Sequence, residues 1–400
     1  MQMQIEFKIL TQLVSEQRCK CSSVFSISSD VVHDEDILQN MAYEHKVESC
    51  IYVACKENSE LLTQESIMVL KKHVAIALLK RTIMQQQLSL IEDAFLNEGI
   101  KPLIIKGPAS SLQLYGNPVT REYTDIDLVI APEHFSQVLS IMENIGYLEK
   151  SGSSSLTDSN YLKNENVLMQ KMHHLIFTSL KSPFRIEIHN AFFSGLTYNE
   201  SYTTESVLAR SVALIYQGIT YHVPSIKDHV LLLIMHGTKH AWQSLHWLID
   251  MVAVFSIEDK ELHCDICRGI EDLHLQKHTA LLIALIKELF SIEIPMPYMK
   301  YYTRYQKNVK RQLAIARHKL TSMNILTPSI WDTISFSWNY LVPLAETSKE
   351  KFKVGLNPFL ISPQDFKTLR LPKYLMWLHI LLRPLFVIER RLKSRWERGR

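Results

Sequence analysis

Residues 101–131 read KPLIIKGPASSLQLYGNPVTREYTDIDLVIA, and this pattern predicts two strands joined by a turn and a short helix. The first strand covers residues 103–105. The second strand carries Asp125 and Asp127, whose side chains face the same way because strand residues alternate between the two faces. Two adjacent carboxylates repel each other. The pair therefore predicts a divalent cation between them.

The turn after the first strand has the features of a phosphate site. A helix is expected to begin at Gly107 and to include Ser110. The first N–H groups of a helix have no partner inside it, and the positive end of the helix dipole lies there, so phosphates bind well. Lys106 adds a positive charge. Lys106, Gly107 and Ser110 are therefore candidate triphosphate contacts.

The composition is that of a globular protein with a large core. The 400 residues are 46% apolar and 21% charged, and the formal net charge of +3 gives no general attraction to nucleic acid. Six cysteines are too few for a disulfide framework in a chain of this length. The first residues lack the pattern of a secretory signal, and no apolar run has the roughly 18–20 residues of a membrane span. We expect a cytoplasmic protein.

Helical patterns outnumber strand patterns along the chain. Residues 65–97 predict one long helix, with Leu70 and Leu78 on its packed face. Extended segments are expected at 175–179, 184–190 and 219–223, the first two as a β-hairpin. From Ser225 the pattern is helical, with helices expected over 242–255 and 261–289.

A third carboxylate and a histidine share one face of the second hairpin strand. These are Glu187 and His189. Three carboxylates together with triphosphate oxygens would complete the octahedron that Mg²⁺ requires. His189 would then order an acceptor or move a proton. The alternatives are a hydrogen-bonded structural histidine and, for Glu187, a surface strand position paired with a lysine.

Further candidates are basic side chains and histidines near these strands. His236, Lys239 and His240 lie on a helix expected to cover the site, where they could bind triphosphate or substrate. Core or surface positions are the alternative for all three. Arg121 lies just before the acidic strand and is a candidate to offset phosphate charge together with Lys106. A solvated loop residue is the alternative for Arg121.

The order of these motifs resembles a known family. The motifs are I-K-G at 105–107, R-x-x-x-D-I-D-L at 121–128, R-I-E-I-H at 185–189, then His236 and H-W-L-I-D at 246–250. Over roughly residues 65 to 295 the chain resembles the uncharacterised nucleotidyltransferase family, which is related to the DNA polymerase β superfamily. One departure is the turn, where the superfamily usually has Gly-Ser and this chain has Lys-Gly.

The resemblance implies an α+β fold, with a mixed β-sheet, flanking helices and a mainly helical C-terminal domain. The expected divisions are an N-terminal helical or irregular segment, a nucleotidyltransferase domain, a helical domain covering the cleft, and a helical tail with a basic end. The N-terminal segment is expected over residues 1–62 and the nucleotidyltransferase domain over 63–224. The helical domain is expected over 225–330 and the tail over 331–400.

The resemblance also implies a reaction. A nucleoside monophosphate would pass from an NTP, expected to be ATP, to a hydroxyl of a small molecule, peptide or protein. Asp125, Asp127 and Glu187 would bind Mg²⁺ or Mn²⁺, with two ions activating the acceptor hydroxyl and stabilising pyrophosphate. Nucleic acid is not the expected acceptor, because basic, aromatic-rich surfaces are not visible outside the tail. Two alternatives stay open: a non-catalytic nucleotide-binding or interaction protein with this fold, and metal-dependent hydrolysis of phosphate esters.

The C-terminal residues 371–400 form an apolar and aromatic stretch that ends in the basic run RRLKSRWERGR. A basic amphipathic end can bind an anionic membrane surface, which would make the protein peripheral to a membrane. The alternative is a docking helix with a solvated basic face.

Overall fold

The computed structural model describes residues 5–19, 22–23, 33–57, 62–149, 174–180, 182–193, 202–322, 330–357 and 382. The chain packs into two compact units. The first combines residues 1–158 with 173–323, and the second combines 159–172 with 324–400. The first unit holds the sheet and all the candidate residues named above.

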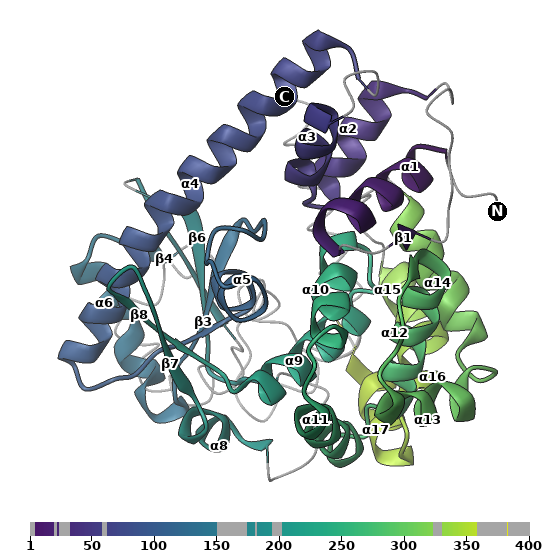
Figure 1. Ribbon diagram of the computed structural model, residues 1–400. Coiled ribbons are helices and arrows are strands. Elements are labelled where there is room, and N and C mark those ends of the chain that lie inside the picture. The colour runs from purple at the N-terminus through teal and green to yellow at the C-terminus, as the bar shows by residue number, and fades with distance from the viewer. Residues whose placement is uncertain are drawn as a thin grey trace. The chain divides into compact units, whose positions relative to one another are not determined.

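The first unit is built from short strands and longer helices (Figure 1). Its strands are β1 (Ser22–Ser23), β2 (Leu103–Ile105), β3 (Asp125–Val129), β4 (Leu148–Glu149), β5 (His174–Ser179), β6 (Ser182–His189), β7 (Val212–Tyr216), β8 (Ile219–Val223) and β9 (Phe290–Ser291). Its helices are α1 (Ile5–Val14), α2 (Glu35–Glu44), α3 (Glu48–Glu57), α4 (Gln64–Asn97), α5 (Gly107–Tyr115), α6 (Val138–Asn144), α8 (Thr204–Ala209), α9 (Ile226–Lys239), α10 (Leu245–Phe255), α11 (Lys260–Asp272), α12 (Gln276–Leu289), α13 (Met296–Tyr305) and α14 (Lys310–Thr321).

The central sheet has five strands in the order β2-β3-β6-β5-β4. β3 pairs antiparallel with β2 and parallel with β6, while β5 pairs antiparallel with β6. The sheet is therefore mixed, which confirms the predicted α+β fold, and β5–β6 is the predicted hairpin. The predicted strand at 219–223 is also confirmed, and it forms a separate two-stranded sheet with β7.

The 34-residue helix α4 leads into the first strand of the sheet. Thr63 caps its start, because the Thr63 hydroxyl accepts a hydrogen bond from the Ser66 N–H. Its last turns bury Leu88 and Phe95, and the helix contacts β6. The prediction that Leu78 lies on the packed face is wrong, since this side chain is 46% exposed. The helix packs along only part of its length, so its periodicity does not mark one continuous buried face.

The helical pattern predicted from Ser225 is confirmed: Ser225 caps α9, because its hydroxyl accepts a hydrogen bond from the Asp228 N–H. The single helix predicted over 261–289 is wrong: the segment forms α11 and α12, separated by a turn. His274 lies in that turn with φ of 54°, a conformation that a helix cannot contain. Buried Leu273 and Leu275 flank His274, so packing stabilises the break.

The N-terminal helices also belong to the first unit. The backbone carbonyl of His45, in the turn between α2 and α3, accepts a hydrogen bond of 3.1 Å from the Ser244 hydroxyl. The imidazole Nδ1 of His45 accepts one of 3.2 Å from the Leu245 N–H, at the start of α10. These bonds hold the turn after α2 in place.

The second unit contains α15 (Ile330–Phe336), α16 (Val342–Leu344) and α17 (Ser348–Leu356). A reciprocal capping box between Thr347 and Glu350 begins α17. Nearly all of the predicted membrane-binding segment 371–400 lies outside the described residues. Within the described part of the chain, no helix combines the length and apolar content needed to cross a membrane.

Candidate active site

The two predicted aspartates lie on β3, one of the inner strands of the sheet. Ile126 and Leu128 are fully buried on one face of this strand, and Asp125 and Asp127 project from the other. The parallel register places Asp127 opposite Glu187 and Asp125 opposite Arg185 on β6. Tertiary pairing thus brings the third predicted carboxylate beside the pair.

Three side chains form the tightest group of potential metal ligands among the described residues. One donor atom from each of Asp127, Glu187 and His189 lies within 4.8 Å of the other two. His189 Nε2 is 2.8 Å from Asp127 Oδ1 and 3.9 Å from Glu187 Oε2. Because Glu187 and His189 are two residues apart on β6, both face Asp127. His189 therefore belongs to the carboxylate group, as its position on the strand predicted.

Asp125 stands at the edge of this group and is not one of its three members. Arg185, which sequence reasoning left unassigned, lies between the acids. Its guanidinium is 2.7 Å from Glu187 Oε1 and 3.4 Å from Asp125 Oδ2. A period of two already places Arg185 on the face of Glu187, so the signal was present in the sequence. Metal binding by Asp125 stays a prediction.

Lys106 completes the group from the turn after β2. Its ammonium lies 2.8 Å from Asp127 Oδ1. The residue has φ of 55° and ψ of −149°, an unfavourable backbone conformation for a side chain with a Cβ, which costs roughly 1–3 kcal/mol. Next to it, a Cβ on Gly107 would lie 3.3 Å from the backbone oxygen of Asp125. Glycine thus lets the turn approach β3 closely enough for Lys106 to reach the carboxylate.

The two central carboxylates have opposite pKa shifts. Burial alone would raise the pKa of Asp127, but the Lys106 ammonium and His189 together hold this pKa well below its usual range. Burial and the neighbouring charge of Asp127 raise the pKa of Glu187. Asp127 is therefore the permanent negative charge of the group, and Glu187 is its more readily protonated member.

The predicted residues at the end of α9 lie near Lys106. Desolvation and the Lys106 charge lower the pKa of Lys239. Burial, Lys239 and Lys106 lower the pKa of His240 to about 4, and similar causes lower that of His236. The Lys106 charge thus acts on all three side chains, and the rings of His236 and His240 lie 4.7 Å apart. Lys106 and Lys239 give this group two ammonium charges, which is the kind of group that binds a polyanion.

Trp247 packs against the histidines of this group. Its ring lies 5.1 Å from that of His236, edge to face, and 5.7 Å from that of His240. Trp247 itself is half-buried beside these rings. The fully buried tryptophan of this region is Trp242.

Two predicted phosphate contacts lie in the interior. Ser110 is fully buried, and its hydroxyl is 2.9 Å from Nε2 of His229 on α9. Arg121 is 4% exposed, and its Nε donates a hydrogen bond of 2.7 Å to Asp250 on α10. Ser110 thus joins α5 to α9, and Arg121 joins the loop before β3 to α10. Their roles in phosphate binding stay predictions without support from the geometry.

Because His229 is buried, we expect the free energy of unfolding to fall in acid. Its ring contacts the Gln113 amide and the Ser110 hydroxyl, and burial lowers its pKa to about 3. Its unfolded-state pKa is near 6.5, so below pH 6.5 the unfolded chain binds more protons and stability falls until about pH 3. Between pH 7 and 5 this one group should remove about 2 kcal/mol of unfolding free energy. Urea denaturation at both pH values measures it.

The matched comparison uses His229→Gln, which cannot be protonated in this range. Its pH-dependent loss should be smaller than that of the wild type by about the same 2 kcal/mol. Exposed His318→Gln should keep the wild-type difference. Equal pH dependence in the wild type and in His229→Gln would contradict the prediction.

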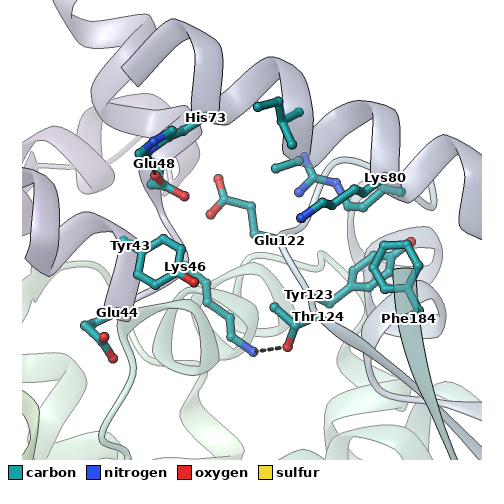
Figure 2. Close-up of a pocket in the computed structure, with 13 residues that line it drawn as sticks. Tyr43, Glu44, Lys46, Glu48, His73, Lys80, Glu122, Tyr123, Thr124 and Phe184 are labelled. Carbon is teal, nitrogen blue, oxygen red and sulfur yellow. Dashed lines mark hydrogen bonds and ion pairs between the residues drawn. The ribbon is translucent and has the colours of Figure 1, made fainter. Parts of the chain in front are cut away.

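Lys46, which the sequence left without a role, reaches the beginning of β3 from the turn after α2. Its ammonium donates a hydrogen bond of 3.3 Å to the Thr124 hydroxyl, directly before Asp125 (Figure 2). Desolvation lowers the pKa of Lys46, while the charges of Asp125 and Asp127 act to raise it. No local pattern indicates this contact, because 78 residues separate the two partners.

The fold and the site together define the class of protein. A helix begins directly after one strand, paired acids lie on the next, and a third acid lies on a parallel strand beside them. This is the arrangement that the motifs predicted for a nucleotidyltransferase. The chain belongs to the uncharacterised nucleotidyltransferase family, whose model matches residues 33–291. No curated protein and no solved structure matches the chain.

The match begins about thirty residues before the resemblance seen in the motifs. It therefore includes α2, α3 and the turn that carries Lys46.

Proposed function

We propose that the protein transfers a nucleoside monophosphate from an NTP to a hydroxyl of a small molecule, peptide or protein, with Mg²⁺ or Mn²⁺. The observation that carries the proposal is the group of Asp127, Glu187 and His189 beside Lys106. Family membership supports nucleotidyl transfer in general. ATP is the proposed nucleotide.

The donor set suits a hard divalent cation. Carboxylate oxygens of Asp127 and Glu187 are ligands that Mg²⁺ and Mn²⁺ prefer. Lys106 and Arg185 now offset the charge of these carboxylates, and both are long side chains that a cation can replace. When bound, the cation would supply charge neutralisation at the phosphates and would lower the pKa of the acceptor hydroxyl. We propose Asp127 and Glu187 as its ligands, with Asp125 as a further candidate.

The protein's own residues would bind and orient the reactants. Lys106 and Lys239 would provide the charges that hold the triphosphate, and His240, directly after Lys239 at the end of α9, would contact it as well. The acceptor oxygen would bond to the α-phosphorus as the bond from that phosphorus to the bridging oxygen breaks, and pyrophosphate would leave. His189, whose Nε2 is hydrogen-bonded to Asp127, would accept the proton from the acceptor hydroxyl.

The test measures nucleotide binding and transfer separately. The full-length protein is titrated with fluorescent ATP and GTP analogues, with Mg²⁺ and with EDTA. It is then incubated with α-³²P-labelled NTPs and candidate hydroxyl compounds. We expect Mg²⁺-dependent binding and label transfer with equimolar pyrophosphate. Binding without transfer to any compound would favour the non-catalytic reading, and labelled monophosphate without an acceptor would favour hydrolysis. Absence of Mg²⁺-dependent binding would refute the proposal.

A further inference from the structure

Lys46, in the turn that follows α2, has an unusual backbone conformation. Its φ is 56°, in the left-handed region that residues with a Cβ rarely adopt. Two backbone hydrogen bonds close the helix here, one of 3.0 Å from the Lys46 N–H to Tyr43 and one of 2.9 Å from the Val47 N–H to Ala42. Glycine is the residue that usually takes the left-handed position in this motif. A lysine there costs conformational energy, so we expect its side chain to have a function.

The turn is anchored, and this fixes where the Lys46 side chain can reach. Its neighbours His45 and Val47 are both buried, and two hydrogen bonds from the start of α10 hold His45 in place. From here the Lys46 ammonium reaches the start of β3 and lies 3.3 Å from the Thr124 hydroxyl (Figure 2). Lys106 reaches the same end of the sheet, since antiparallel pairing places the end of β2 beside the start of β3. Two lysines thus approach the carboxylates of β3, each from a turn with a positive φ.

The Lys46 ammonium has hydrogen-bonding capacity that the described residues do not use. It has three N–H donors, and within the described part of the chain only the Thr124 hydroxyl accepts from one of them. Among the same residues no carboxylate forms an ion pair with Lys46, and the buried acids Glu48 and Glu122 contact a histidine ring and a backbone N–H instead. The half-buried side chain lines a cavity of about 390 Å³, from which a ligand can reach it. Such an ammonium can bind an anion through charge-assisted hydrogen bonds.

We propose that Lys46 binds a phosphate oxygen of the NTP, as a third ammonium in addition to Lys106 and Lys239. The N-terminal helices would then contribute a residue to the active site. The identification of the anion as a nucleotide rests on the proposed nucleotidyl transfer. The alternative is that Lys46 only offsets the charge of Asp125 in the folded protein. The two roles differ in what removal of the ammonium does to folding and to anion binding.

Lys46→Gly separates the two roles, because it removes the ammonium and supplies the residue that the turn prefers. Its melting temperature should equal or exceed that of the wild type, since glycine adopts a positive φ without strain. The full-length protein is titrated, with Mg²⁺ and without an acceptor, with a fluorescent ATP analogue and with inorganic tripolyphosphate. Both affinities should fall about tenfold in Lys46→Gly, the effect of losing one charge-assisted hydrogen bond. Lys46→Arg keeps the charge and should restore most of the affinity.

Lys80→Met is the matched control for Lys46→Met, since Lys80 lines the same cavity but is exposed. Lys46→Met should bind both probes about tenfold more weakly, and Lys80→Met should change either affinity by less than about twofold because solvent screens its charge. Unchanged affinities in Lys46→Gly, or no binding of either probe by the wild type, would overturn the inference. Label transfer is measured separately. Binding that depends on Lys46 without any transfer would retain the anion site and reject the enzyme, whereas transfer with binding independent of Lys46 would do the reverse.

Discussion

Asp127→Asn should reduce nucleotidyl transfer by on the order of a thousandfold. This is the scale expected when an active site loses a negative charge that binds the cation and positions the neighbouring charged side chains. Asp127 contacts Lys106 and His189 at 2.8 Å each and faces Glu187 across the strand pair. Asparagine keeps the shape of the side chain but removes the negative charge. It would weaken cation binding and release Lys106 from its fixed position. Initial rates of label transfer at saturating Mg²⁺ measure the effect.

Asp125→Asn is the matched control, because it makes the same change two residues away on the same face. If Asp127 and Glu187 hold the cation, Asp125→Asn should lose at least tenfold less activity than Asp127→Asn. Equal losses would show that both aspartates bind metal, as the family resemblance implies. Wild-type activity in Asp127→Asn would contradict the proposed site altogether.

Asp250→Asn should lower the free energy of unfolding by about 3 kcal/mol, because it leaves the Arg121 guanidinium buried without its counter-charge. The side chains of Arg121 and Asp250 are 4% and 1% exposed, and their contact is 2.7 Å. Asp250 also accepts a hydrogen bond of 3.0 Å from the Tyr115 hydroxyl on α5. The pair thus joins the loop before β3 to α5 and α10. Urea denaturation at pH 7 measures the loss.

A double variant separates charge from packing at this position. Arg121→Met with Asp250→Leu removes both charges and should recover much of the stability lost in Asp250→Asn, as replacement of buried ion pairs by apolar side chains often does. The KM for NTP of this double variant then tests the phosphate role predicted for Arg121. An unchanged KM means that Arg121 serves the fold alone. A small stability loss in Asp250→Asn would show that the pair is more accessible than its burial indicates.

Much of the fold follows from local patterns in the chain. The alternation around Asp125 and Asp127, the hairpin of β5 and β6, and the cap at Ser225 depend on residues only a few positions apart. The single helix predicted across 261–289 failed for the opposite reason. Its periodicity continues through His274, but the packing of Leu273 and Leu275 favours a turn.

The sequence predicted several residues of the candidate site correctly, but it predicted less of how they are arranged. Glu187 and His189 were expected near Asp127, and the strand register places them there. Arg185 was overlooked although strand alternation places it on the face of Glu187, and Lys46 was missed because 78 residues separate it from Thr124. Ser110 and Arg121 were expected at the phosphates, but Ser110 is buried against His229 on α9 and Arg121 against Asp250 on α10.

The sequence by itself determined that two acids share one strand face, that a Lys-Gly turn and a helix start precede them, and that the chain belongs to a nucleotidyltransferase family. These properties depend on strand alternation, helix starts and motif order, all of which are local. Only the tertiary structure decided that β6 lies parallel to β3 with Glu187 opposite Asp127, that Arg121 is buried against Asp250, and that an N-terminal turn brings Lys46 to Thr124. Such contacts join segments about 60 to 130 residues apart, and they are selected by the burial and charge balance of the whole unit.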